Sequence, residues 1–216
     1  MISVDAGCIL LAVDVANGPA NDKHPLASLV GKLTNPAVLA LLSETIDALA
    51  HSANADLVLQ LPGLKKALRA CGANDEATAD FGNLDDLGSA YTDVIREFAV
   101  KPLAGVLFTL DEVCSEDELD AFGPVTAAAG HCDWLVSAEF RHEGKAAIDN
   151  LVGQIILLPE ESNPPSVADG LIKIGGGLSA KFWSGSTAAG TFNLLYGRIP
   201  GAAVPETVLA QRHSLT

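Results

Sequence analysis

The chain has 216 residues, of which 49% are hydrophobic and 19% are charged, so it is too apolar to remain disordered. Its 27 acidic and 13 basic residues give a formal charge of −14, which opposes contact with nucleic-acid phosphates and anionic membranes. We therefore expect a folded protein without nucleic-acid or membrane partners. At this length, one domain over residues 1–216 is the simplest prediction.

Short apolar runs alternate with longer segments of helical spacing over the first two thirds of the chain. The predicted strands are residues 8–15, 56–61, 103–110, 133–140 and 154–158. The predicted helices are residues 25–51, divided by Asn35-Pro36, then 64–71, 83–100, 115–130 and 145–151. Asn83 and Ser115 are the expected N-caps of two of them, and Gly72 is expected to end the helix before it.

The last third of the chain has a different composition, rich in glycine, serine and proline. Two strands are predicted here, at residues 171–174 and 191–196, followed by a helix at 205–211. Residues 160–216 are therefore expected to form a strand-rich subregion of the same domain.

The repeated order of strand, helix and strand predicts an α/β fold with a mainly parallel sheet and right-handed helical crossovers. Two architectures fit this order. The first is an open sheet with helices on both faces, favoured because the predicted strands outnumber the predicted helices. The alternative is a small or incomplete (β/α)₈-like barrel, for which 216 residues is close to the lower limit.

The four cysteines (Cys8, Cys71, Cys114 and Cys132) have neither zinc-site spacing nor a dense disulfide pattern. Free thiols in a reducing compartment are expected instead. The apolar start has no basic residue before Lys23, unlike a secretory signal. These features predict a cytoplasmic protein.

Acidic side chains follow several predicted strands at their carboxyl ends, where parallel sheets bind ligands. Asp14, Glu112 and Glu160 are candidate ligands for Mg²⁺ or Mn²⁺, which prefer oxygen ligands. Asp111 is a candidate catalytic group at the same edge. The alternative is that these are ordinary surface carboxylates of an acidic chain.

The fourth strand ends in Glu139-Phe140-Arg141-His142. Glu139 and His142 together provide a carboxylate and an imidazole suited to proton transfer, so both are candidate catalytic residues. Arg141 is a candidate anchor for an anionic substrate.

Three consecutive glycines, Gly175, Gly176 and Gly177, follow the predicted strand at 171–174. Backbone N–H groups of glycines after a strand can bind phosphate or carboxylate, and Lys173 adds a positive charge nearby. A tight turn that only glycine can adopt is the alternative explanation.

Together these residues predict a small-molecule enzyme of the lyase or isomerase type, acting on a carboxylated or phosphorylated metabolite. A non-catalytic ligand-binding or assembly protein is the alternative. Alanine-rich segments suited to close packing favour a homo-oligomer in either case.

Overall fold

The computed structural model describes residues 1–7, 25–53, 55–112, 114–140, 155–159 and 173–215. These residues contain a seven-stranded parallel sheet with helices between its strands, which confirms the predicted α/β class. The strands are β1 (Ile2–Asp5), β2 (Leu57–Pro62), β3 (Leu103–Leu110), β4 (Leu135–Phe140), β5 (Ile155–Leu158), β6 (Lys173–Gly177) and β7 (Leu194–Tyr196).

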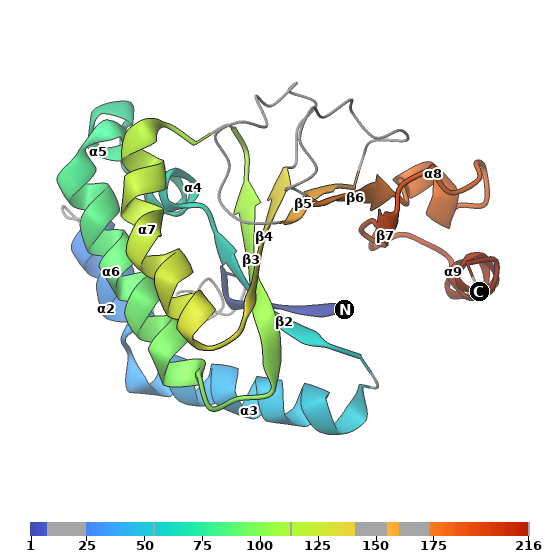
Figure 1. The fold of residues 1–216 in the computed structure, drawn as a ribbon, viewed down its shortest axis with the longest axis horizontal. Helices are drawn as coiled ribbons and strands as arrows, with labels where there is room; N and C mark the ends of the chain where they lie inside the picture. The colour runs from blue at the N-terminus through green and yellow to red at the C-terminus, as the bar shows by residue number, and fades with distance from the viewer. Residues whose placement is uncertain (8–24, 54, 113, 141–154, 160–172, 216) are drawn as a thin grey trace.

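The strands lie side by side in the order in which they occur in the chain, and every neighbouring pair is parallel. Figure 1 shows that the sheet is curled. Sequential order and curl are features of a barrel, so the arrangement is that of the incomplete-barrel alternative. Its first strand is Ile2–Asp5, ahead of the predicted run at 8–15, which lies outside the described residues.

Helices connect the first four strands. They are α2 (Pro25–Leu33), α3 (Pro36–Ser52), α4 (Leu64–Ala70), α5 (Asp75–Ala79), α6 (Phe81–Phe98) and α7 (Glu116–His131). The predicted helix at 145–151 lies outside the described residues. In the described part of the chain no single helix is long and apolar enough to cross a membrane, and only α2 and α3 together, bent by 50° at their break, meet that test by length and composition.

Local capping chemistry explains most helix boundaries. The side chain of Asn35 accepts a hydrogen bond from the backbone N–H of Ala37 at 2.9 Å, and Gly72 has a φ of 88° just after α4. Ser115 caps α7 as predicted. The prediction for α6 was wrong, because Asp80 accepts from the N–H of Asn83 and α6 begins two residues before Asn83.

Alternate residues of each strand face opposite sides of the sheet. On the outer side, Leu59, Phe108 and Ala138 belong to one large core that also contains buried hydrophobic residues of α2, α3, α4, α6 and α7. On the inner side, Val58, Leu107 and Leu157 form a smaller apolar cluster, against which Tyr196 packs. The inner face is therefore apolar in its middle.

The last two strands are accompanied by α8 (Ala180–Trp183) and α9 (Pro205–His213). Leu178, Phe182 and Trp183 form a small core of their own, with Val208 of α9 packed against it. This part extends away from α6 and α7 in Figure 1. β7 pairs with β6 in a register that places Tyr196 opposite Gly177.

Candidate functional site

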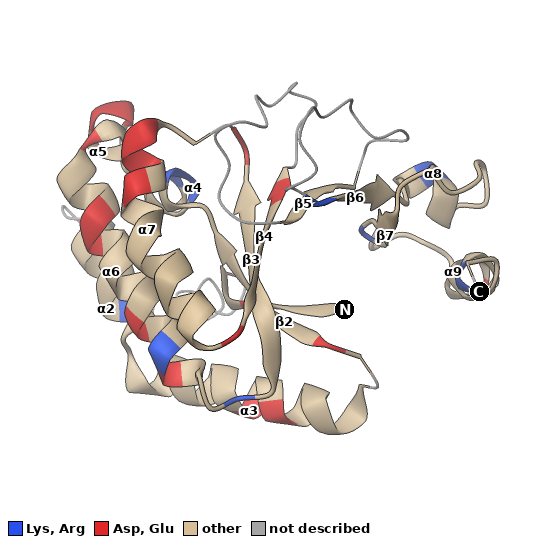
Figure 2. Ribbon diagram, in the orientation of Figure 1, with Lys and Arg blue, Asp and Glu red and all other residues tan. Residues whose placement is uncertain are grey.

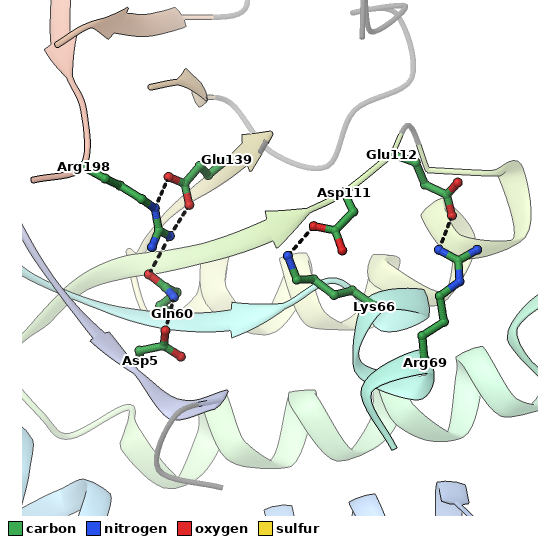
Figure 3. Close-up of polar contacts among 8 residues, drawn as sticks. All are labelled: Asp5, Gln60, Lys66, Arg69, Asp111, Glu112, Glu139 and Arg198. Atoms are coloured by element: carbon green, nitrogen blue, oxygen red, sulfur yellow. Dashed lines mark hydrogen bonds and ion pairs between the residues drawn. The ribbon is translucent and has the colours of Figure 1, made fainter. Parts of the chain in front are cut away.

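Polar side chains from four strands and the segment after β7 gather on the inner face of the sheet, toward the carboxyl ends of the strands. We call this group the polar cluster, and Figure 3 shows its central members. Its members are Asp5 of β1, Gln60 of β2, Glu139 of β4, Tyr196 of β7, and Arg198, two residues beyond β7.

Glu139 is the centre of the polar cluster. Its side chain is 0% exposed, and its two oxygens accept hydrogen bonds from Nε and Nη2 of Arg198. The hydroxyl of Tyr196 donates a further hydrogen bond to Glu139 Oε1 at 3.1 Å. A buried carboxylate is costly unless it is paired and hydrogen-bonded, and these three bonds meet that requirement.

Gln60 links the Glu139–Arg198 ion pair to Asp5 on the first strand. Its Oε1 accepts from Nη2 of Arg198 at 3.3 Å, and its Nε2 donates to Oδ2 of Asp5 at 2.6 Å. Gln60 is almost fully buried, and register places Asp5 opposite it. Both polar ends of the Gln60 amide are therefore satisfied within the cluster.

The environment of the polar cluster shifts two proton equilibria. Burial, with the nearby negative charge of Glu139, raises the pKa of Tyr196 well above its ordinary value. The hydrogen bonds to Glu139 raise the pKa of Arg198. Tyr196 therefore stays a hydroxyl donor at neutral pH and Arg198 stays a cation. The Arg198 side chain is 39% exposed, and its Nη1 makes no hydrogen bond with any residue that the structure describes.

Two ion pairs lie beyond β3, apart from the polar cluster in Figure 3. Lys66 of α4 pairs with Asp111, and Arg69 of the same helix pairs with Glu112 at 2.7 Å. Asp111 and Glu112 thus join the end of β3 to α4. Within the described residues, the ion-pair partners of Asp111 and Glu112 are these two cations and not Glu139.

Glu118 makes a second buried carboxylate site, at the junction of α4 and α7. Its Oε1 accepts a hydrogen bond from the backbone N–H of Lys65, in α4, at 3.1 Å, and this contact is with another helix and not with the N-terminus of α7. Burial raises the pKa of Glu118. Burial and the charge of Glu118 likewise raise the pKa of Cys114. These contacts tie α7 to the start of α4.

The glycine run lies inside β6 instead of following it, which corrects the predicted position. Gly175 and Gly176 pair with β5 and β7, and Gly177 ends the strand with a φ of 85°. A Cβ on Gly175 would meet side-chain carbons of Leu157 and Leu194 at 2.9 Å, so a larger residue there would require these two leucines to shift. The predicted anion-binding role of the run is a separate matter and stays a prediction.

Lys173 precedes the glycines on the same strand, as predicted. It is the first residue of β6 and is exposed, with Ile155 opposite it. Because parallel strands share one direction, this is the opposite edge of the sheet from the polar cluster. Lys173 and the polar cluster therefore lie toward opposite ends of the strands, and the predicted role of Lys173 in anion binding stays a prediction.

The other predicted residues fall outside the described part of the chain: Asp14, Arg141, His142 and Glu160. Among the described residues no group of three or more His, Cys, Asp or Glu side chains is arranged to hold a metal ion. The Mg²⁺ or Mn²⁺ site proposed on Asp14, Glu112 and Glu160 thus stays a prediction. Figure 2 shows how acidic residues are spread over α5, α6 and α7.

Glu139 was predicted at a strand end, whereas Asp5, Tyr196 and Arg198 were not predicted as site residues. The rule that polar residues follow strand ends was applied only as far as the fifth strand. Extended to the strand at 191–196, it selects Tyr196 and Arg198, at and just beyond its end. Asp5 was missed because no strand was predicted before residue 8, whereas β1 is Ile2–Asp5.

Comparisons with protein-family models, with curated proteins and with solved structures found no match to this chain.

Proposed function

We propose that this protein is a small-molecule enzyme of the lyase or isomerase type, and that its carboxylated or phosphorylated substrate binds at the polar cluster. The observation behind this proposal is the fully buried Glu139 held by Arg198, a cation that is itself partly exposed. Buried, paired titratable groups at the carboxyl ends of parallel strands are typical of active sites.

Arg198 is the proposed anchor for the substrate anion. Two edges of its guanidinium are occupied by Glu139 and Gln60, while Nη1 makes no hydrogen bond among the described residues. A guanidinium can donate up to five hydrogen bonds, so an anion at Nη1 leaves the contact with Glu139 intact or partly replaces it.

Glu139 and Tyr196 are the proposed proton-transfer pair. In a lyase or isomerase step, Glu139 takes the proton from a carbon next to a carbonyl, and the electrons of the C–H bond move to the carbonyl oxygen. The Tyr196 hydroxyl has a single proton to donate, so in this step it turns from Glu139 to that oxygen and stabilises its negative charge. The raised pKa of Tyr196 keeps this donor protonated.

Binding is the first test of this proposal. Carboxylated and phosphorylated metabolites are screened for an increase in the melting temperature of the wild-type protein. Each hit is then repeated with Arg198→Lys and with Arg96→Lys, whose exposed side chain pairs only with Asp93 among the described residues. We expect the stabilisation to be lost in R198K and kept in R96K. No hit in the wild type, or equal stabilisation of R198K, would contradict the proposal.

Catalysis is tested on the same hits. The metabolite is incubated with protein in D₂O, and uptake of deuterium at carbon is followed by NMR. Wild-type protein should catalyse the exchange, and Tyr196→Phe should slow it at least tenfold while still binding the metabolite. If a hit binds at Arg198 without exchange or conversion, the alternative of a non-catalytic binding protein is correct.

The assembly alternative also has an observation in its favour. Residues Leu194, Leu195, Ile199, Val204 and Leu209 are all more than one third exposed, and all belong to β7, α9 or the segment between them. We propose that the protein forms a homo-oligomer, since an exposed edge strand with apolar side chains favours association. Light scattering at several concentrations tests this, and a monomer at every concentration contradicts it.

A further inference from the structure

One buried polar side chain on the inner face of the sheet has no partner among the described residues. The structure describes seven buried polar side chains, of which six make a side-chain hydrogen bond: Gln60, Thr78, Thr92, Glu118, Ser137 and Glu139. The seventh is Thr109 of β3, which is 3% exposed and whose hydroxyl makes no hydrogen bond with any described residue. Burial of a hydroxyl without a hydrogen bond is destabilising, so threonine at this position is unfavourable for stability alone.

Thr109 lies beside the polar cluster. Phe108 belongs to the outer core and Leu107 to the inner apolar cluster, so alternation places the Thr109 side chain on the inner face. Register pairs Thr109 with Glu139 on the adjacent strand, and adjacent strands are about 4.8 Å apart. The hydroxyl of Thr109 and the carboxylate of Glu139 therefore project side by side from the same face of the sheet.

Arg198 crosses the strand that carries Thr109. Its Nη2 donates to Gln60 on β2 and to Glu139 on β4, and β3 is the strand between these two. Figure 3 shows the guanidinium between the two side chains. Gln60 is level with Leu107, so Thr109 lies one step nearer the carboxyl ends of the strands, where parallel sheets bind ligands. An anion bound at Arg198 is therefore held close to Thr109.

We infer that Thr109 is a specificity residue whose hydroxyl binds a hydroxyl group of the substrate, so that the substrate is a hydroxylated carboxylate or phosphate. The inference rests on the function proposed above, in which Arg198 binds the anion and Tyr196 binds the carbonyl oxygen, and it adds a third substrate group. A threonine hydroxyl donates one hydrogen bond and accepts others, and a second hydroxyl can take part in both ways. The substrate then supplies the hydrogen bond that the fold does not give to Thr109.

The first experiment asks whether the Thr109 hydroxyl has a partner within the fold. Thr109→Val keeps the shape of the side chain and removes the hydroxyl. Thr92→Val is the matched control, because the buried Thr92 hydroxyl donates to the carbonyl oxygen of Gly88 at 3.0 Å. We expect the melting temperature of the ligand-free protein to stay the same or rise in T109V and to fall in T92V. A fall in T109V as large as that in T92V would overturn the inference.

The second experiment compares matched ligands on the wild-type protein. Hydroxylated carboxylates and phosphates are each tested beside the analogue that lacks the hydroxyl, such as lactate with propionate, malate with succinate, and glycerol 3-phosphate with propyl phosphate. We expect at least one hydroxylated probe to raise the melting temperature clearly more than its analogue does. Equal stabilisation by both members of every pair that binds would overturn this inference but leave the anion-binding function standing. If no carboxylate or phosphate stabilises the protein, both proposals are wrong.

The third experiment assigns the preference to Thr109. Calorimetry gives the affinities of wild type, T109V and Thr109→Ser for the hydroxylated ligand found above and for its analogue. We expect T109V to lose about tenfold or more in affinity for the hydroxylated ligand and to bind the analogue as the wild type does. T109S keeps the hydroxyl, so its affinities should stay within about threefold of the wild type. Equal loss of both ligands in T109V, or a loss in T109S as large as that in T109V, would overturn the inference.

Discussion

Glu139 and Arg198 are 59 residues apart in the sequence, yet the guanidinium of Arg198 donates to both oxygens of the Glu139 carboxylate. Glu139 lies on the middle strand of the sheet and Arg198 follows its last strand. The same Arg198 side chain reaches Gln60 on the second strand. The curl of the sheet therefore brings its first and last parts to one polar cluster.

Loss of Arg198 should destabilise the protein more than loss of an exposed arginine. Arg198→Met leaves Glu139 buried without its two strongest donors, so we expect the free energy of unfolding at pH 7 to fall by about 2–4 kcal/mol. Arg96→Met removes an exposed ion pair and should change it by less than about 1 kcal/mol. Urea unfolding measures both, and equal effects would show that the buried pair contributes nothing.

Glu118 should make stability depend on pH in the sense opposite to an ordinary surface carboxylate. Its folded pKa is raised by burial, so the folded state binds the proton more tightly than the unfolded state. This contribution is complete below the unfolded pKa and is lost as pH rises through the folded pKa. Wild type should therefore lose stability relative to Glu118→Gln as pH increases from about 4 to neutral. A difference between the two proteins that is constant over this range in urea unfolding would contradict the assignment.

Two helical glycines should respond oppositely to the same substitution. A Cβ on Gly88 of α6 would lie 2.4 Å from the carbonyl oxygen of Ala121 in α7, whereas a Cβ on Gly130 of α7 meets nothing within 4 Å. Gly88→Ala should force the helices apart and lower the free energy of unfolding by about 1–3 kcal/mol. Gly130→Ala should raise it by about 0.5–1 kcal/mol, because alanine loses less backbone entropy in a helix. Thermal unfolding distinguishes the two signs, and stabilisation by G88A would disprove the close contact.

Gly177, the last glycine of the run in β6, should contribute to stability even without a ligand. Gly177 has a φ of 85°, and a Cβ there would lie 3.0 Å from the backbone of Gly190. Gly177→Ala should lower the free energy of unfolding by about 1–2 kcal/mol in buffer without phosphate or carboxylate. Gly31→Ala in α2 is the control, since its Cβ would meet nothing within 4 Å. Unchanged stability of G177A would show that the run is kept for another reason, such as anion binding.

Features set by neighbouring residues could be predicted from the sequence. Asn35 and Ser115 cap helices, and Gly72 ends one, because each acts on a backbone group a few residues away. The parallel sheet followed from the alternation of strands and helices. Asn83 failed as a cap because Asp80, three residues earlier, offers the same chemistry and begins the helix sooner.

Features that depend on the curl of the sheet could not be predicted. Glu139 was placed correctly at a strand end, but its partner Arg198 is set by how far the sheet bends back toward β2. The position of the glycines likewise depends on the register of β6 against β5, which apolar patterning does not fix. Asp111 resembled Glu139 in sequence position, yet the start of α4 supplies Lys66 to pair with it.

NMR of the arginine side chains tests the central claim most directly, because it reports on Arg198 itself. Protein labelled with ¹⁵N-arginine is titrated with a carboxylated or phosphorylated metabolite that stabilises it, and the Nε–H signals are assigned with Arg198→Lys and Arg69→Lys. We predict that the Arg198 signal shifts in a saturable manner while the Arg69 signal, from the ion pair with Glu112, does not. A saturable shift of Arg69 with no change at Arg198 would place the ligand outside the polar cluster and contradict this account.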